Sequence, residues 1–150
     1  MKRVIVIGLA AAALAAIAAS AAGAGSVQRL PGFRSPTGNI KCLFVPGSGG
    51  RLLCSIGRAD YAVSAQARCM SRAGLDWHGF SLGAARRGSL VCTGGILYNP
   101  DTQRPSYLTL AYGKTWSHSA FTCRSRVSGV ACRSGSGHGL FVSRQAYRLW

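Results

Sequence analysis

Hydrophobic and polar residues alternate over short segments along most of this chain, and turn-forming residues separate these segments. The clearest case is a pair of segments, 39–45 and 51–56, on either side of the Gly- and Ser-rich run 46–50. If that run closes a hairpin with Val45 opposite Arg51, Cys42 lies directly opposite Cys54, and the apolar residues of both segments share one face. The pattern predicts an antiparallel hairpin that a disulfide can bridge.

A second segment, 121–132, repeats this plan. Gly129 can supply the positive φ that ends a short hairpin turn, and Cys123 and Cys132 then lie about opposite each other. The segment predicts a second bridged hairpin.

The remaining segments also favour short strands. Strands are expected at 79–82, 89–92, 107–112 and 140–142, with Leu108, Leu110 and Tyr112 on one face of the third. Residues 60–71 are the one stretch typical of a helix, with Asp60 as its N-cap, and Ser143 is expected to cap a terminal turn. The fold class that follows is all-β, with short antiparallel strands, hairpins and one short helix in a small disulfide-stapled sandwich or barrel.

The N-terminus is typical of a secretory signal peptide. Lys2 and Arg3 precede an apolar, charge-free stretch and a run of small residues. We expect a signal peptide over 1–24 that is cleaved after Ala21 or Ala24, with an uncleaved anchor as the alternative. A flexible lead-in over 25–32 and a single domain over 33–150 follow, with no second apolar span, so the mature protein is expected to be secreted or extracytoplasmic.

All six cysteines follow this signal segment. An even number of cysteines in an oxidising compartment predicts a disulfide framework. The two hairpins give Cys42–Cys54 and Cys123–Cys132, and elimination leaves Cys69–Cys92, whose longer loop predicts the largest stabilisation, about 3 to 4 kcal/mol. No pair has the Cys-x-x-Cys spacing of redox or zinc sites, so neither a metal nor another cofactor is expected.

The charge balance is strongly basic. The chain has 18 Lys and Arg against three Asp and no Glu, which gives a net charge of +15. Such a surface favours polyanions through salt-dependent contacts, whereas a merely solvated basic face is the alternative. The arginines expected at a polyanion-binding surface are Arg86, Arg87, Arg124, Arg126, Arg133, Arg144 and Arg148.

Candidate catalytic residues are few. A ribonuclease that works with two histidines would use His118 or His138, with a nearby cation to stabilise the developing charge. Asp76 beside Trp77 is the one acid in an aromatic setting, but glycoside hydrolysis normally needs two. The three scattered histidines are more typical of surface and turn positions.

Several short motifs between residues 33 and 150 serve as landmarks of this chain. They are Phe33-Arg34-Ser35-Pro36-Thr37-Gly38-Asn39-Ile40-x-Cys42, Asp76-Trp77, Leu110-Ala111-Tyr112-Gly113, Phe121-x-Cys123, Gly129-Val130-x-Cys132 and Gly137-His138-Gly139-Leu140-Phe141-Val142-Ser143-Arg144. Together these landmarks resemble a family of small exported actinobacterial six-cysteine proteins of unknown function. The resemblance implies one domain with paired cysteines outside the membrane, and it contributes no catalytic residue.

These observations favour a monomeric, non-catalytic binding or envelope-associated module whose partners are anionic polymers or other cell-envelope components. The alternative is a small secreted hydrolase such as a histidine-dependent ribonuclease. A cationic defence protein that disturbs anionic membranes is a third option, but no amphipathic helix outside the signal supports it.

Overall fold

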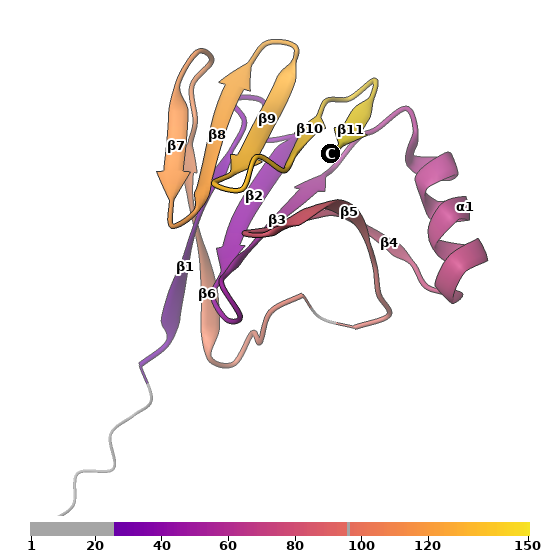
Figure 1. The fold of residues 1–150 in the computed structure, drawn as a ribbon, viewed down its shortest axis with the longest axis horizontal. Coiled ribbons are helices and arrows are strands. Elements are labelled where there is room, and N and C mark those ends of the chain that lie inside the picture. Colours follow the sequence, from indigo (N-terminus) through magenta and orange to yellow (C-terminus); the bar gives the residue numbers. More distant parts are fainter. Residues whose placement is uncertain (1–25, 96) are drawn as a thin grey trace, which may run out of the picture.

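The computed structural model describes residues 26–95 and 97–150, which form two β-sheets packed face to face with one helix at the side (Figure 1). The predicted signal peptide and its cleavage sites lie outside the described residues. The two separate sheets make the fold a β-sandwich and not a barrel, and the all-β, disulfide-stapled fold class is confirmed.

The first sheet has the strand order β5-β4-β3-β2-β1-β6. Its neighbours are antiparallel except for β1 and β6, which run parallel. The strands are β1 (Gln28–Arg34), β2 (Ile40–Val45), β3 (Arg51–Ile56), β4 (Trp77–Gly83), β5 (Arg86–Cys92) and β6 (Gln103–Thr109).

The second sheet is antiparallel, with the order β11-β10-β9-β8-β7. The helix α1 (Ala62–Ala73) lies between β3 and β4 in the sequence and ends at Gly74, which takes the left-handed conformation. The strands are β7 (Thr115–His118), β8 (Phe121–Arg126), β9 (Gly129–Ser134), β10 (Gly139–Val142) and β11 (Tyr147–Leu149).

The hydrophobic core lies between the sheets and takes alternate residues from both. Its fully buried aromatic residues are Phe33 and Phe80 from the first sheet and Phe121 from the second. The sheets also meet along one side, where the Gly88 amide in β5 donates to the Trp150 carbonyl after β11, at 3.3 Å. This contact closes the sandwich on that side.

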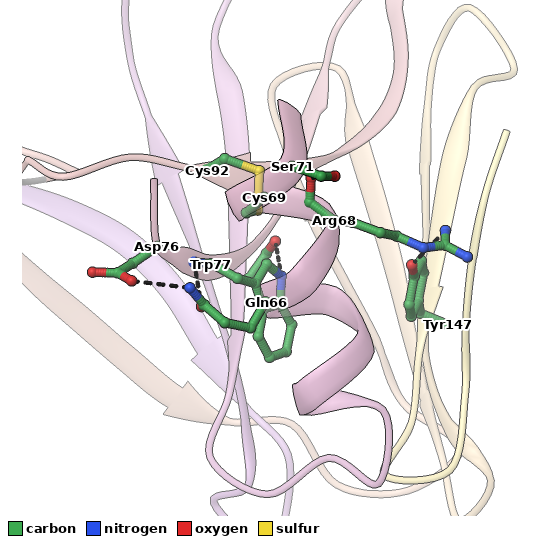
Figure 2. Close-up of a disulfide and its surroundings, with 9 residues drawn as sticks. Gln66, Arg68, Cys69, Ser71, Asp76, Trp77, Cys92 and Tyr147 are labelled. Carbon is green, nitrogen blue, oxygen red and sulfur yellow. Dashed lines mark hydrogen bonds between the residues drawn. A yellow bond between two sulfur atoms is a disulfide. The ribbon is translucent and has the colours of Figure 1, made fainter. Parts of the chain in front are cut away.

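The three disulfides are the pairings predicted from the sequence. Cys42–Cys54 and Cys123–Cys132 bridge directly opposed residues of their hairpins, with Cα–Cα distances of 4.1 and 4.0 Å. The first hairpin has the expected register, with Val45 opposite Arg51. Cys69–Cys92 ties α1 to β5, as Figure 2 shows.

The flexible lead-in predicted for 25–32 is wrong from Gln28 onward. This segment is the first part of β1, and Leu30 within it is fully buried. The sequence suggested a lead-in because of Pro31 and Gly32, but β2 pairs with β1 only from Gly32 onward. Pro31 therefore lies where β1 has β6 alone as a neighbour, and its missing N–H is tolerated.

The helix starts two residues later than predicted, and Asp60 does not cap it. Tyr61 is the N-cap and makes no side-chain capping bond. The Asp60 carboxylate instead accepts from Nε of Arg144, at 3.2 Å. The Asp60 carboxylate therefore pairs with the guanidinium of Arg144 instead of capping α1.

The C-terminal segment also differs from its prediction. Ser143 does close a turn, since its Oγ accepts from the Ala146 amide at 3.0 Å. However, the residues that follow form β11 and not a terminal turn, because they complete the second sheet beside β10.

The predicted strand over 107–112 starts four residues and ends three residues too late, and its three residues expected on one face do not share one. β6 ends at Thr109, and Leu108 and Tyr112 are exposed, while Leu110 is buried. β6 is an edge strand whose pairing partner β1 lies about 75 positions upstream, so its own alternation does not decide its orientation.

Candidate functional site

A cleft of about 790 Å³ opens at one end of the sandwich, where loops from both sheets meet. The turn between β1 and β2, the segment after β3 and the turn between β8 and β9 all line it. Its cationic lining residues are Arg34, Lys41, Arg58, Arg126 and Arg144.

The turn over 35–39 is held by its own hydrogen bonds. The Ser35 amide donates to the Ile40 carbonyl at 2.8 Å, and Oγ of Ser35 accepts from the Ile40 amide at 3.1 Å. Gly38 has φ of +72°, which the reversal of the chain needs. Ser35 is buried, so this side of the cleft is a fixed wall.

Asn39 fixes the segment that carries Arg58. Its side-chain amide accepts from the Arg58 amide at 2.8 Å and donates to the Arg58 carbonyl at 3.0 Å. Both bonds involve the backbone of Arg58, so the guanidinium is left available to a ligand. The two bonds place Arg58 beside the turn that follows Arg34.

The turn between β8 and β9 forms the opposite side of the cleft. Arg126 pairs with Gly129, so Val127 and Ser128 make a two-residue loop. Gly129 has φ of +139°, and a Cβ there would lie 2.5 Å from the Val142 carbonyl oxygen. Val127 is 83% exposed at the tip of this hairpin.

The charges around the cleft are largely uncompensated. Among the described residues, one ion pair is present, between Arg144 and Asp60, and both side chains are more than half exposed. No aspartate lies among the described lining residues. Arg34 donates from Nε to the Thr109 hydroxyl at 3.0 Å, which leaves its terminal nitrogens available. Guanidinium groups in this state suit bidentate contacts with phosphate, sulfate or carboxylate.

The back of the cleft is anchored to the core through Tyr61. Its hydroxyl donates to the carbonyl of Ser143, a lining residue, at 3.1 Å. Burial, with a smaller contribution from the nearby Tyr147, raises the pKa of Tyr61 well above its usual range. The hydroxyl therefore keeps its proton further into the alkaline range than an exposed tyrosine does.

Residues 8–150 match the family of unknown function DUF6636. The chain belongs to this family. No curated protein matches the chain, and no solved structure does. Within this DUF6636 protein, the cleft takes residues from four of the landmark segments that carry the sequence resemblance, at 34–40, Tyr112, 129–130 and 143–144.

The structure brings two of the seven predicted arginines, Arg126 and Arg144, into the cleft. Arg124, Arg133 and Arg148 alternate with core residues along their strands, on the outer face of the second sheet. Two of these three cover aromatic rings: Arg133 lies 5.7 Å from the ring centroid of Trp150, and Arg148 lies 5.2 Å from that of Phe141.

Arg86 and Arg87 lie at the start of β5, away from the cleft. A terminal nitrogen of Arg87 donates to the Leu149 carbonyl at 3.4 Å. The seven arginines therefore do not form one surface.

The predicted histidines lie at the same end of the second sheet but are separated by strands β8 and β9. His118 pairs with Phe121, Phe121 pairs with Ser134, and the Ser134 amide donates to the His138 carbonyl. Three interstrand spacings of about 4.8 Å place their backbones about 14 Å apart. The ring of His118 lies against Phe44, with 4.5 Å between centroids, and stacks on Trp116, so it covers the edge of the core.

Asp76 holds α1 in place, as Figure 2 shows. Its carboxylate accepts from Nε2 of Gln66 in α1 at 3.0 Å, and Oε1 of Gln66 accepts from the Trp77 amide at 2.9 Å. Gln66 thus bridges α1 and the start of β4, next to the Cys69–Cys92 disulfide.

One group of possible metal ligands occurs among the described residues: the sulfur atoms of Cys42, Cys54 and Cys132 lie within 4.8 Å of one another. All three belong to disulfides, so none is a thiolate that could bind a metal.

Within residues 26–95 and 97–150, the structure contains no helix with the length and hydrophobicity of a membrane span.

Arg34, Lys41 and Arg58 are not among the residues predicted from the sequence to bind polyanions. The local sequence pattern could have indicated the first two. The turn-rich run 35–39 lies between two strands, and a hairpin there places Arg34 opposite Lys41. Arg58 had no such signal, because its position depends on the bonds with Asn39.

Proposed function

We propose that this DUF6636 protein is an extracytoplasmic, non-catalytic module that binds anionic polymers of the cell envelope or its surroundings. The cleft at the end of the sandwich is the proposed binding site. The observation that carries this proposal is the convergence of five cationic side chains on one cleft, with no aspartate among its described lining residues.

Electrostatic repulsion among the cleft cations favours a bound anion. Like charges within a Debye length, about 8 Å at physiological salt, repel one another and destabilise the fold. An anion that enters the cleft relieves this repulsion and gains charge-assisted hydrogen bonds. The charge arrangement therefore favours binding of anions without any catalytic group.

A polymer suits the cleft better than a single small ion. The five cations come from separate parts of the chain and surround about 790 Å³. A chain of linked anionic groups contacts several of them at once, and each further contact is then intramolecular.

An oxidising location outside the cytoplasm is part of the proposal. The three disulfides support it, because such bonds persist in oxidising compartments. The apolar N-terminal segment after Lys2 and Arg3 supports export by the secretory route.

The direct test measures binding of the oxidised protein, residues 25–150, to labelled dextran sulfate, polygalacturonate and RNA over a salt series. Arg34→Ala and Arg58→Ala each remove one charge of the cleft, and Arg86→Ala removes one charge elsewhere. We expect each cleft variant to weaken binding about tenfold at low salt and to lower the salt slope by about one unit. Arg86→Ala should bind as the unchanged protein does.

An equal loss of affinity in all three variants would reject the cleft and favour a diffuse basic face. The RNA arm also tests the alternative function, because chain length is recorded together with binding. Shortened RNA that is lost on His118→Ala or His138→Ala would support a ribonuclease.

A further inference from the structure

A second apolar cluster lies on the outer face of the first sheet, apart from the core. Leu30, Leu43 and Leu53 are at most 5% exposed, although they alternate with the residues that face the second sheet. None of the three belongs to the core cluster between the sheets. An outer sheet face this deeply buried must be covered by another part of the chain.

The cover comes from the connection between β5 and β6 and from β6 itself. Leu97 and Tyr98 of this connection line one cavity together with Leu43 and Leu53. The connection runs away from the second sheet and returns to β6 beside β1 (Figure 1).

The end of the connection is fixed to β1. The Gln28 amide donates to the Thr102 carbonyl at 2.8 Å. The Gln103 side chain also reaches that of Gln28, at 3.2 Å.

Tyr107, which lines the cavity, lies beside Gly32 of β1. In the parallel register, Tyr107 pairs with Gly32, and a Cβ on Gly32 would lie 3.1 Å from the Tyr107 ring. Because Gly32 has no side chain, the Tyr107 ring can lie against the sheet at this position.

The cavity has a volume of about 220 Å³, and polar and apolar groups line it in similar measure. Leu43, Leu53, Val91 and Leu97 supply aliphatic walls, and Tyr98 and Tyr107 supply aromatic ones. The polar groups at its edge are Lys41, Ser55 and His78, and all three residues are exposed.

The two tyrosine hydroxyls are available as hydrogen-bond donors. Tyr98 and Tyr107 both line the cavity. Burial, followed by the nearby Tyr98, raises the pKa of Tyr107 above its ordinary value. A protonated tyrosine hydroxyl can donate to a carboxylate oxygen.

We propose that this cavity is a binding site for a small aromatic carboxylic acid of about the size of benzoate. An apolar cavity of about 150 Å³ admits benzene, so the volume here suits one ring with one small substituent. The aliphatic walls and the tyrosine rings contact the aromatic ring, and the Lys41 ammonium and the tyrosine hydroxyls receive the carboxylate.

This site goes beyond the proposed polymer binding and does not depend on it. The cavity and the basic cleft share one lining residue, Lys41, at the point where they approach each other. Every other wall of the cavity lies outside the cleft, so variants can separate the two sites.

The test uses isothermal titration and ligand-observed NMR on oxidised residues 25–150, with benzoate, benzyl alcohol and acetate as probes. We expect benzoate to bind with a Kd on the order of 0.1 to 1 mM, in line with the affinity that so few atoms can supply. Benzyl alcohol, which has the ring without the charge, should bind about tenfold more weakly. Acetate, which has the charge without the ring, should not bind measurably in this range.

Two variants block the cavity from different sides. Val91→Phe fills it from β5, and Ser55→Phe covers its rim from an exposed position that tolerates a larger side chain. Both should lower benzoate affinity at least tenfold, and Val63→Phe, at an 84% exposed position of α1, is the matched control. Lys41→Met should weaken benzoate but leave benzyl alcohol unchanged.

Arg58→Ala separates this proposal from polymer binding. It should weaken dextran sulfate and leave benzoate unchanged, whereas Ser55→Phe should do the reverse. Absence of benzoate binding, or benzoate binding that is lost in Arg58→Ala and retained in Ser55→Phe, would overturn the proposal.

Discussion

The sulfur of Cys132, in the second sheet, lies within 4.8 Å of the sulfur of Cys54, in the first. Each belongs to a disulfide that bridges a hairpin, so the two bridges face each other across the core. All four cysteines are at most 2% exposed. These disulfides therefore act as core packing as well as covalent links between strands.

We predict that replacing the Cys42–Cys54 pair by alanines costs more stability than replacing Cys69–Cys92. The chain-entropy model gives about 3 kcal/mol for both and favours the longer Cys69–Cys92 loop by about 0.5 kcal/mol. Truncation in the core adds a cavity cost of about 1 to 2 kcal/mol. Cys69 is fully buried but Cys92 is only half-buried, so truncation of this pair leaves less of a void than truncation of two buried cysteines.

The measurement is the free energy of unfolding in guanidinium chloride for the two double variants, with the remaining disulfides oxidised. A larger loss for the Cys69/Cys92 variant would mean that loop entropy outweighs packing in this fold.

Gly79 lies at a bulge where its backbone passes close to β3. Its φ is +120°, and a Cβ there would lie 2.3 Å from the Cys54 carbonyl oxygen. We predict that Gly79→Ala destabilises the protein by about 3 kcal/mol or more. Gly38→Ala is the control, because Gly38 has positive φ but open space around it, and should cost about 1 kcal/mol. Similar thermal unfolding of both variants would contradict the steric argument.

Ser125 carries an unpaired hydroxyl inside the sandwich. It is fully buried in β8, and its Oγ has no hydrogen-bond partner among the described residues. Burial of an unsatisfied hydroxyl costs about 1 to 3 kcal/mol, whereas alanine loses little volume. We predict that Ser125→Ala raises the free energy of unfolding by about 1 kcal/mol, as measured by urea titration. A lower stability of this variant would show that the hydroxyl has a hydrogen-bond partner in solution.

Local pattern was sufficient to predict both cysteine hairpins. In each, a turn joins two segments with a period of two, and cysteines that are 12 or 9 positions apart lie directly opposite. The pairing of β1 with β6 was not predictable in this way. It joins segments 75 positions apart, and its parallel register depends on burial that only the assembled sheet supplies.

The basic cleft was only partly predictable from the sequence, because it also joins segments that are far apart in the chain. Arg126 and Arg144 were selected because arginines cluster near them, but Arg34 and Arg58 lie in separate segments without such a cluster. The bonds between Asn39 and Arg58 join residues 19 positions apart and have no local signature.

Stability should fall above about pH 10, with Tyr61 as one cause. Burial raises the pKa of Tyr61, so the unfolded chain loses this proton at a lower pH than the folded protein does. The unfolded state then binds fewer protons, and the free energy of unfolding decreases as pH rises beyond 10; below that pH the contribution is fully present. We predict that Tyr61→Phe lowers stability by about 1 kcal/mol at pH 7 through loss of the bond to Ser143 and flattens the alkaline slope. Parallel alkaline profiles for both proteins would exclude Tyr61 as the cause.

Repulsion among the cleft cations predicts a coupling between anions and thermal stability. Arg58 contributes to the cleft through its side chain alone, because its backbone carries the bonds to Asn39, so Arg58→Ala should keep the local fold. At low ionic strength we expect this variant to unfold at the same temperature as the unchanged protein or slightly above it.

Millimolar tripolyphosphate should raise the midpoint of thermal unfolding of the unchanged protein by several degrees, since a ligand at 100 times its Kd adds about 2.7 kcal/mol. The gain should be clearly smaller in Arg58→Ala and unchanged in Arg86→Ala, whose site lies at the start of β5. Equal gains in all three proteins would mean that the polyanion stabilises the fold through its overall positive charge and not through the cleft.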